Sequence, residues 1–287
     1  MSALPASREP EVTESDFTRF RDFFYRKTGI MFGDNKRYFV DKRLQERMLA
    51  IGQTAFRDYF NTLRFQASGE EFQALVNLMT VNETYFYREE YQFHCLVRSI
   101  LPEIARTKRR GEPVRIWSVP CSTGEEPYSI AFQLLDNWAD VDHYDVEIVA
   151  SDIDTHVIEQ AKRGFYGERS VQHVPRATLD RFTRRVRGAY EVIPDIRDSI
   201  AFTRVNLSDP LSTRQFRDFD VVFCRNLLIY FDDASRRDAA QTIYDALNPG
   251  GFVCLGHSES MSRISSLFAI RKFAEAIVYQ KPFDAES

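Results

Sequence analysis

The hydrophobic positions near the start of the chain follow the period of an amphipathic helix. Phe17, Phe20 and Phe24 recur at intervals of three and four residues, so that their side chains share one helical face. Ser15 precedes them as a candidate N-cap, and Gly29 follows them as a stop signal. The pattern therefore predicts a first helix between these two residues, with its phenylalanines turned toward a core.

Similar spacing continues along the next part of the chain and predicts a small helical domain over 15–81. Further helices are predicted at 34–50, at 54–66 and from Ser68 onward. Ser68 and Glu71 have the spacing of a capping box at the start of the last of these helices. The polar, proline-containing residues 1–14 are expected to form a disordered lead-in.

The pattern changes at about residue 113, where short β-rich runs begin to alternate with helical stretches. The runs interpreted as strands are VRIWSV (114–119), VEIVAS (146–151), IAFTRVN (200–206), DVVFC (220–224) and GFVCLG (251–256). Helices are predicted between them at 125–136, 154–163 and 233–247. Such alternation is typical of an α/β domain with a mostly parallel sheet and helices on both faces. FAIRKF (268–273) and AIVYQK (276–281) predict an antiparallel pair at the sheet edge.

Two segments fit neither pattern. Residues 82–112 are interpreted as a linker that leads into a bridging helix at about 89–110. Residues 183–202, which contain the single Gly188, are interpreted as a small antiparallel β-subdomain. This subdomain is predicted to be inserted in a larger α/β domain that spans 113–287.

Composition narrows the class of protein. The formal net charge of −4 lacks the basic excess of a nucleic-acid binder, so no nucleic acid is expected as a partner. The chain has no run of about 18 apolar residues, and its polar start lacks the apolar stretch of a secretory signal. The four cysteines form no CxxC, and the five histidines show no zinc-like spacing. These features predict a cytoplasmic protein with reduced thiols, no metal and no membrane insertion.

The first candidate ligand-binding residues lie where the first predicted strand turns into a helix, in SVPCSTGEEPYS (118–129). Small residues there let a ligand approach free backbone N–H groups at the end of a strand, where open α/β sheets bind ligands. The turn lacks GxGxxG, and Glu125 and Glu126 would repel a pyrophosphate but suit an ammonium and a sulfonium. S-adenosylmethionine is therefore favoured over NAD. In the alternative interpretation, both carboxylates simply stabilise the helix dipole.

Polar residues also follow two other predicted strands. Asp152 can accept hydrogen bonds from both hydroxyls of a ribose, whereas Asp154 fits the N-cap of the next helix. Asn226 can bond amide or amino groups of a ligand, and Tyr230 can place its hydroxyl at a pocket mouth. The alternative for Tyr230 is a tyrosine of the core.

Together these segments resemble the CheR family of chemoreceptor glutamate methyltransferases. The matching motifs are, in order, TVNETYFYRE (80–89), CSTGEEPYS (121–129), ASDID (150–154), CRNLLIYF (224–231) and GHSES (256–260). The resemblance implies an N-terminal helical domain, a Rossmann-like S-adenosylmethionine-dependent catalytic domain and an inserted β-subdomain. It also implies that the substrate is a glutamate side chain in the cytoplasmic domain of a methyl-accepting chemoreceptor.

The resemblance assigns roles to individual residues as well. Cofactor contacts are implied for Asn82, Thr84, Arg88, Glu126, Asp152, Asn206, Leu207, Asn226 and Leu227. Arg88 and Tyr230 match residues near the transferred methyl group and are implied to be catalytic. Lys36, Arg43 and Arg47 share one face of a predicted helix, and the resemblance suggests that this face docks receptor helices. A plain solvated face is the alternative.

The implied reaction depends on orientation of the substrate carboxylate more than on its activation by a base. A glutamate side chain has an ordinary pKa of about 4.3, so it is already an anion at neutral pH and needs no general base. In-line placement of carboxylate, methyl and sulfur can by itself accelerate the transfer greatly. Arg88 and Tyr230 are expected to orient the substrate oxygen.

Other functions are weighed against this one. A nucleic-acid N-methyltransferase would show an Asn-Pro-Pro-aromatic loop where CRNLLIYF stands, and a hydrolase elbow would end in glycine where GHSES ends in serine. A methyltransferase of another substrate class and a non-enzymatic module that senses S-adenosylmethionine stay open. Some relatives grip a C-terminal receptor peptide with a glycine-rich β-subdomain. Because 183–202 is short, no such dependence is expected for this chain.

Overall fold

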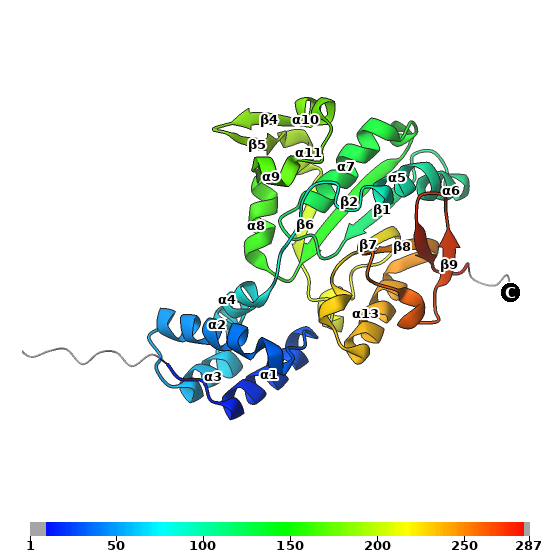
Figure 1. The fold of residues 1–287 in the computed structure, drawn as a ribbon. Coiled ribbons are helices and arrows are strands. Elements are labelled where there is room, and N and C mark those ends of the chain that lie inside the picture. The colour runs from blue at the N-terminus through cyan, green and yellow to red at the C-terminus, as the bar shows by residue number, and fades with distance from the viewer. Residues whose placement is uncertain (1–9, 284–287) are drawn as a thin grey trace, which may run out of the picture. The chain divides into compact units, whose positions relative to one another are not determined.

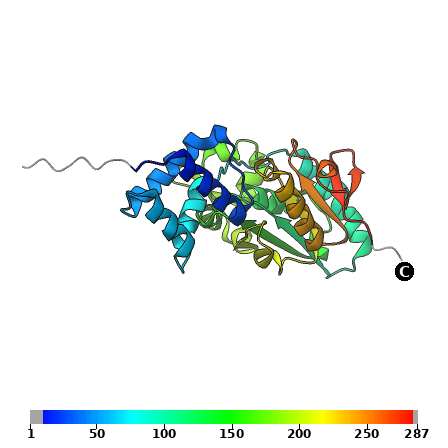
Figure 2. The ribbon, with the colours of Figure 1, turned by 90° about the horizontal axis from the view of Figure 1, so that it is seen from below.

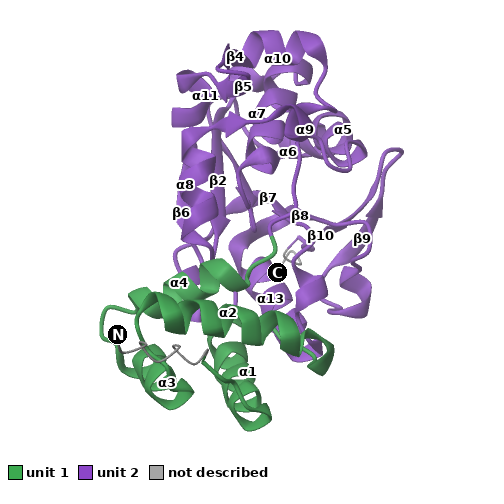
Figure 3. Cartoon of the chain, turned by 60° about the vertical axis from the view of Figure 1, so that its left-hand side comes forward, with its two compact units in different colours: residues 1–81 green, residues 82–287 purple. Residues whose placement is uncertain are grey.

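A computed structural model describes residues 10–283 of the chain. The chain divides into two compact units, residues 1–81 and 82–287, which Figure 3 shows in green and purple. The lead-in predicted for 1–14 lies outside the described residues as far as residue 9, and the first helix begins at Glu14. Each unit has its own secondary structure and is described separately.

The elements of unit 1 within residues 10–81 are all helices, and its core is rich in phenylalanine. Its elements are α1 (Glu14–Thr28), a 3₁₀ turn (Asp34–Lys36), α2 (Arg37–Ala50), α3 (Phe56–Phe65) and α4 (Glu70–Met79). Phe20 and Phe24 of α1 are fully buried, and Phe23 meets Phe60 of α3 edge-on, with 5.4 Å between ring centroids. The periodicity of the sequence thus identified the face of α1 that packs in the core.

The start of α1 differs from the prediction. Thr13, rather than Ser15, is the N-cap: its hydroxyl accepts the Asp16 N–H, and the Asp16 carboxylate accepts the Thr13 N–H in return. This reciprocal pair is a complete capping box. Ser15 has no such partner. The predicted stop at Gly29 is confirmed, because Gly29 ends the helix in the left-handed conformation with φ of 74°.

The capping box predicted at the start of α4 is wrong. Gly69 is the N-cap of this helix, and the N–H groups of its first turn are accepted by the Gln66 side chain, from Glu71 at 2.8 Å, and by the Ser68 hydroxyl, from Glu70 at 3.4 Å. The Glu71 carboxylate accepts hydrogen bonds from Arg47 and from the buried Tyr59 hydroxyl instead of returning to Ser68. A buried carboxylate requires strong donors, and this requirement outweighs the gain from capping one helix end.

Unit 2 is built on a seven-stranded, mostly parallel sheet (Figure 1). Its strands are, in sheet order, β6 (Ile200–Arg204), β2 (Asp145–Asp152), β1 (Pro113–Ser118), β7 (Phe219–Cys224), β8 (Leu247–Leu255), β10 (Ile277–Gln280) and β9 (Ala269–Lys272). The first five are parallel, and β10 and β9 form an antiparallel pair at the edge. Strand β7 is buried at every position, which explains its nearly continuous apolar sequence. The predicted α/β class is confirmed.

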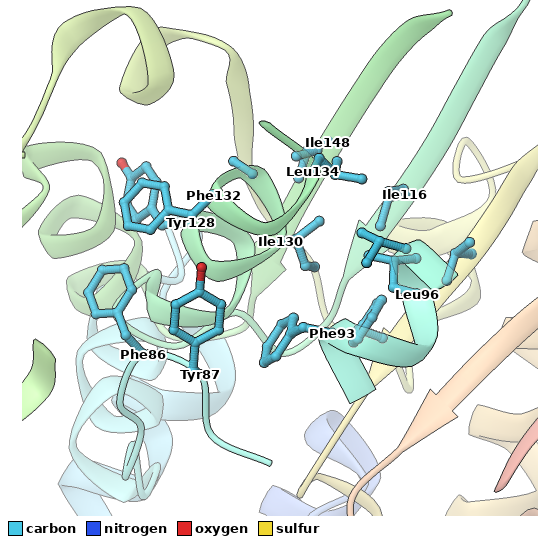
Figure 4. Packing of buried hydrophobic residues seen from close by; sticks show 14 of the residues in the cluster. Phe86, Tyr87, Phe93, Leu96, Ile116, Tyr128, Ile130, Phe132, Leu134 and Ile148 are labelled. Atoms are coloured by element: carbon cyan, nitrogen blue, oxygen red, sulfur yellow. The ribbon is translucent and has the colours of Figure 1, made fainter. Parts of the chain in front are cut away.

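Helices connect the parallel strands and cover the sheet. They are α5 (Tyr91–Cys95), a π-helical turn (Leu96–Ile100), α6 (Leu101–Thr107), α7 (Glu125–Asn137), α8 (Thr155–Arg163), α12 (Pro210–Thr213) and α13 (Asp233–Ala246), with short 3₁₀ turns at Val141–His143, Leu228–Tyr230 and Met261–Arg263. Figure 2 shows α13, in gold, lying over the strands. In Figure 4, Phe86, Phe93 and Phe132 pack with aliphatic side chains of the sheet in one buried cluster.

An antiparallel insertion lies between α8 and β6. It comprises β3 (Phe165–Tyr166), α9 (Glu168–Val171), α10 (Arg176–Phe182), β4 (Thr183–Val186), β5 (Ala189–Val192) and α11 (Pro194–Asp198), with strand order β3-β5-β4. Its sheet starts earlier in the chain than the predicted 183–202, and Ile200 already belongs to β6 of the main sheet. Elements of two to seven residues contain too few periodic positions to be identified from the sequence.

Candidate active site

The candidate site lies where β1, β2 and β7 end. These strands end at Ser118, Asp152 and Cys224. The chain passes from β1 to β2 and then β6 on one side, and it returns to β7 on the other side of β1. Open α/β sheets bind ligands at the carboxyl ends of strands where the order reverses in this way.

The turn after β1 exposes backbone to this end of the sheet. Gly124 has φ of +98°, and a Cβ there would lie 2.8 Å from both the Ala161 Cβ and the Tyr166 Oη, so only glycine fits. Ser122 also has a positive φ, +48°. Its N–H donates to Asp152 Oδ2 at 2.8 Å, which ties the turn to the end of β2.

Asp152 is a buried carboxylate stabilised by backbone N–H groups. It is 4% exposed, and it accepts the N–H groups of Ser122 and Asp154 at 2.8 and 2.9 Å. Burial raises the pKa of Asp152 to about 6, although these hydrogen bonds oppose the rise. The position at the end of the second strand fits a carboxylate that accepts ribose hydroxyls.

Asp154 caps the next helix, as predicted. Its Oδ1 accepts the N–H groups of His156 and Val157 at 2.8 and 3.3 Å. Its Oδ2 accepts a hydrogen bond from the Asn82 side-chain amide at 2.9 Å. Asn82, one of the implied cofactor residues, therefore holds the start of unit 2 against the end of β2.

Glu126, the other implied acidic ligand, is paired inside the site. Its carboxylate accepts hydrogen bonds from the Ser118 hydroxyl at 2.7 Å and from Arg225 at 2.9 Å. Burial raises the pKa of Glu126, and the Arg225 charge opposes the rise. Arg225 is 5% exposed, lies 3.3 Å from Glu89 Oε2 and donates to the Arg88 carbonyl at 2.5 Å. One buried guanidinium thus joins α7, the loop after β7 and the segment that precedes α5.

Glu125 turns toward the antiparallel insertion. It accepts hydrogen bonds from the Thr123 hydroxyl at 2.6 Å and from the Ser170 hydroxyl of α9 at 2.9 Å. Tyr166 Oη donates to the Thr123 carbonyl at 2.7 Å, and the Ser170 carbonyl accepts the Phe86 N–H at 3.0 Å. The insertion therefore supports both the turn after β1 and the segment that carries Arg88.

This support leads to a first prediction. Tyr166→Phe and Ser170→Ala each remove a hydrogen bond to the turn, and each is expected to weaken S-adenosylmethionine binding roughly three- to tenfold, the effect of about one hydrogen bond. Calorimetric titration measures the change. Tyr190→Phe is the matched control, because Tyr190 bonds Glu168 and Arg185 within the insertion. Equal dissociation constants for Tyr166→Phe and the control would contradict the prediction.

The two residues implied to be catalytic lie in one electrostatic neighbourhood. Arg88 is half-buried, and its guanidinium donates to the Glu83 carbonyl at 2.7 Å. Tyr230 is 38% exposed in the 3₁₀ turn after β7. Burial raises the pKa of Tyr230, the Glu83 charge adds to the rise, and the Arg88 charge opposes it. The Arg88 cation is therefore close enough to act electrostatically on the partly exposed Tyr230 phenol.

A carboxylate also shapes the loop that carries Asn226 and Leu227. Glu259 accepts the N–H groups of Asn226, Leu228 and Gly256 at 2.8, 2.7 and 2.8 Å. Asn226 has φ of 58°, a conformation that asparagine tolerates better than most residues. A Cβ at Gly256 would lie 2.5 Å from the Asn226 side-chain nitrogen, so the glycine gives this loop its space.

The remaining implied cofactor residues are Asn206, Leu207 and Thr84. Asn206 and Leu207 follow β6, the neighbour of β2, and the Asn206 side-chain oxygen accepts the Ser208 N–H at 3.1 Å. Leu207 is buried. Thr84 is half-buried in the same segment as Asn82 and Arg88. The structure thus brings together residues from five separate segments of unit 2, each at or near a strand end.

The basic residues of α2 are not equivalent. Lys36 is exposed in the 3₁₀ turn before the helix. Arg43 lies 3.4 Å above the Phe39 ring and donates to a carbonyl of α4, and Arg47 forms two hydrogen bonds to Glu71, at 3.0 and 2.6 Å. Arg43 and Arg47 therefore stabilise unit 1 itself, whatever else they contact.

Sequence reasoning missed Arg225, Glu89 and Glu259 as site residues. All three stand inside motifs that were recognised, but no role was derived for them. One available signal was the position of Arg225 directly after a fully apolar strand end. A charge placed there must be buried, and a buried charge requires a partner of opposite sign.

Carboxylates at the strand ends, a glycine turn without a pyrophosphate pattern and the doubly wound sheet define the class of S-adenosylmethionine-dependent methyltransferases. The carboxylates of this site suit a cationic methyl donor. Asp152, Glu126 and the backbone of the turn would hold that donor. Within residues 10–283, no helix is long and apolar enough to cross a membrane.

The chain belongs to the CheR methyltransferase family. Residues 82–277 match "CheR methyltransferase, SAM binding domain", and residues 15–80 match "CheR methyltransferase, all-alpha domain". It is 52% identical to chemotaxis protein methyltransferase 2 of Vibrio cholerae, over 96% of each chain. It is 34% identical to the chemotaxis protein methyltransferase of Escherichia coli, over 91% of this chain and 89% of the relative, and 35% identical to that of Salmonella typhimurium, over 93% and 91%.

Proposed function

We propose that this methyltransferase esterifies glutamate side chains in the cytoplasmic domain of chemoreceptors, and that it acts in the cytoplasm. The observation that carries the proposal is that the Arg88 charge acts on the Tyr230 phenol, and that the Arg88 carbonyl bonds Arg225, which also bonds the Glu126 carboxylate. An arginine and a phenol can orient an anionic acceptor, and the proposed acceptor is a carboxylate. The names of the relatives, all chemotaxis protein methyltransferases, support the same substrate class.

The residues of the site bind and orient. S-adenosylmethionine supplies an electrophilic methyl group on a sulfonium. Loss of this methyl group leaves S-adenosylhomocysteine, whose sulfur is an uncharged thioether. A glutamate oxygen forms the new bond to the methyl carbon as the carbon–sulfur bond breaks, so no proton moves and no base is required. Arg88 and Tyr230 position that carboxylate in line, while Asp152 and Glu126 hold the ribose and amino ends of the donor.

The direct test uses S-adenosylmethionine with a labelled methyl group and membranes that carry chemoreceptors. The expected product is receptor-bound label that dilute base releases, because methyl esters hydrolyse where methylamines do not. Mass mapping then identifies the modified glutamates. Base-stable label would indicate a methyltransferase of another substrate class, and cofactor binding without any transfer would indicate a sensing module.

The pKa of Asp152 leads to a second prediction. Protonation removes the charge that accepts the ribose hydroxyls, so the dissociation constant for S-adenosylmethionine is expected to rise as the pH falls through about 6. Asp152→Asn is expected to bind weakly at every pH, without this dependence. Calorimetric titrations of the protein with S-adenosylmethionine between about pH 5 and pH 8 measure this dissociation constant.

In the ligand-free protein, the titration of Asp152 changes the free energy of unfolding with pH in the opposite direction. Its folded pKa lies above the ordinary value of 3.8, so the folded state binds a proton where the unfolded state does not. The contribution of Asp152 to the free energy of unfolding therefore rises as the pH falls from about 6 toward 3.8. A cofactor affinity that stays constant across this range would contradict the assigned role.

We further propose that the basic face of α2 contributes to receptor docking through Lys36, Arg43 and Arg47. The structure directs the test to Lys36, because charge reversal at Arg43 or Arg47 would also remove contacts inside unit 1. Lys36→Glu should raise the KM for the receptor without changing cofactor affinity. An unchanged KM would leave the face as ordinary solvated surface.

The proposal includes methylation without a peptide tether at the receptor C-terminus. The turn between β4 and β5 contains Arg187 and Gly188 and joins strands of four residues each, so the insertion is compact. Receptors with and without their last residues should therefore be methylated at equal rates. A rate that depends on those residues would overturn this part of the proposal.

A further inference from the structure

Unit 1 carries a groove that the methyl-transfer chemistry does not use. It lies along α1 and α3 and has a volume of about 540 Å³. Cationic and aromatic side chains line it, among them Arg19, Arg26, Phe60, Arg64 and Phe65. We call it the α1/α3 groove.

Arginines in this groove are held in place by aromatic rings. The Arg19 guanidinium lies 5.2 Å from the Phe60 centroid. The Arg64 guanidinium lies 5.8 Å from the Phe60 centroid and 4.9 Å from that of Phe65. Stacking occupies the flat faces of the guanidinium groups and leaves their N–H edges to bind carboxylates, which two parallel N–H groups match well.

Three arginines of the groove form no ion pair among the described residues. Four cations line it against one carboxylate, Asp22, which already lies 3.4 Å from Arg21 outside the groove. Within residues 10–283, no acidic side chain forms an ion pair with Arg19, Arg26 or Arg64. This surplus stands out in a chain whose formal net charge is −4. The electrostatic complement of such a groove is an acidic surface.

The aromatic component identifies the kind of partner. Phe65 is 70% exposed, so an apolar side chain from outside can cover it. Exposed aromatics and arginines together are the residue types that dominate the energy of protein interfaces, whereas small-molecule sites are concave and hold their ligands with convergent buried polar groups. The groove therefore fits a protein segment that combines carboxylates with an apolar side chain.

We propose that the α1/α3 groove docks an acidic segment of the protein substrate, separate from the glutamates that are methylated. This inference rests on the proposed function, in which the substrate is a chemoreceptor. The groove raises the affinity for the substrate and leaves the chemical step unchanged, because its residues belong to unit 1 and the reacting groups belong to unit 2.

The test compares Arg64→Glu with Arg57→Glu in the full chain. Both arginines are exposed on α3, and Arg57 does not line the groove. With a purified receptor cytoplasmic fragment as substrate, Arg64→Glu is expected to raise KM roughly tenfold and to weaken the dependence of KM on salt. The kcat, the cofactor dissociation constant and the melting temperature should match those of the control.

Each outcome separates the two proposals. Equal KM values for the two variants would overturn docking in the groove while leaving methyl transfer intact. If the wild-type protein forms no methyl ester on the fragment, the proposed function fails instead. A dimer that Arg64→Glu dissociates, with KM unchanged, would assign the groove to a second copy of the chain and would also overturn the proposal.

Discussion

Arg225→Met is expected to lower the free energy of unfolding by about 3–5 kcal/mol, because it leaves two buried carboxylates without their cation. Glu126 and Glu89 both bond this guanidinium, and their side chains are 12% and 11% exposed. Cofactor binding should weaken in the same variant, since Arg225 also holds the Arg88 carbonyl. Denaturant unfolding and calorimetric titration measure the two effects.

Arg176→Met is the control for this experiment. Arg176 pairs with Asp180 on the surface, where both side chains are more than half exposed, so its loss should leave the free energy of unfolding close to that of the wild type. Adding Glu126→Gln to Arg225→Met removes one of the stranded charges and should restore part of the stability. A single Arg225→Met variant as stable as the control would show that the buried pairs contribute little.

Arg88→Ala and Tyr230→Phe are expected to lower kcat about 10²-fold, the effect of displacing a reacting group by about 1 Å from its in-line position. Cofactor affinity should change only a few fold, because neither side chain holds Asp152 or Glu126. Single-turnover methylation and calorimetry separate the two quantities. The split between them distinguishes orientation of the substrate from binding of the donor.

Arg98→Ala is the matched control for Arg88→Ala. Arg98 is exposed in the π-helical turn after α5, in the same unit but away from the strand ends. It should retain full activity. Full methylation activity in both Arg88→Ala and Tyr230→Phe would remove these residues from the mechanism.

Local sequence was a sound guide to two helix ends whose contacts join residues that are close in the chain. The Gly29 stop and the Asp154 cap were predicted because a helix end depends on its own neighbours. The error at α4 arose where a distant partner competed for the same group. Glu71 had the correct spacing for a cap but bonds Arg47, which lies 24 residues away. The small insertion was misplaced because its strands and helices are too short to contain enough periodic positions.

The sequence by itself determined the class of this protein. Alternating strands and helices, a small-residue turn with two glutamates and an aspartate after the second strand are all local patterns, and they identify a sheet that binds S-adenosylmethionine. Only the tertiary structure decided how the charges of the site are balanced. Arg225 meets Glu126 across 99 residues of chain, and no local pattern encodes that pairing. Because burial makes an unpaired charge costly, the Arg225 charge requires a partner, and only the fold brings Glu126 next to it.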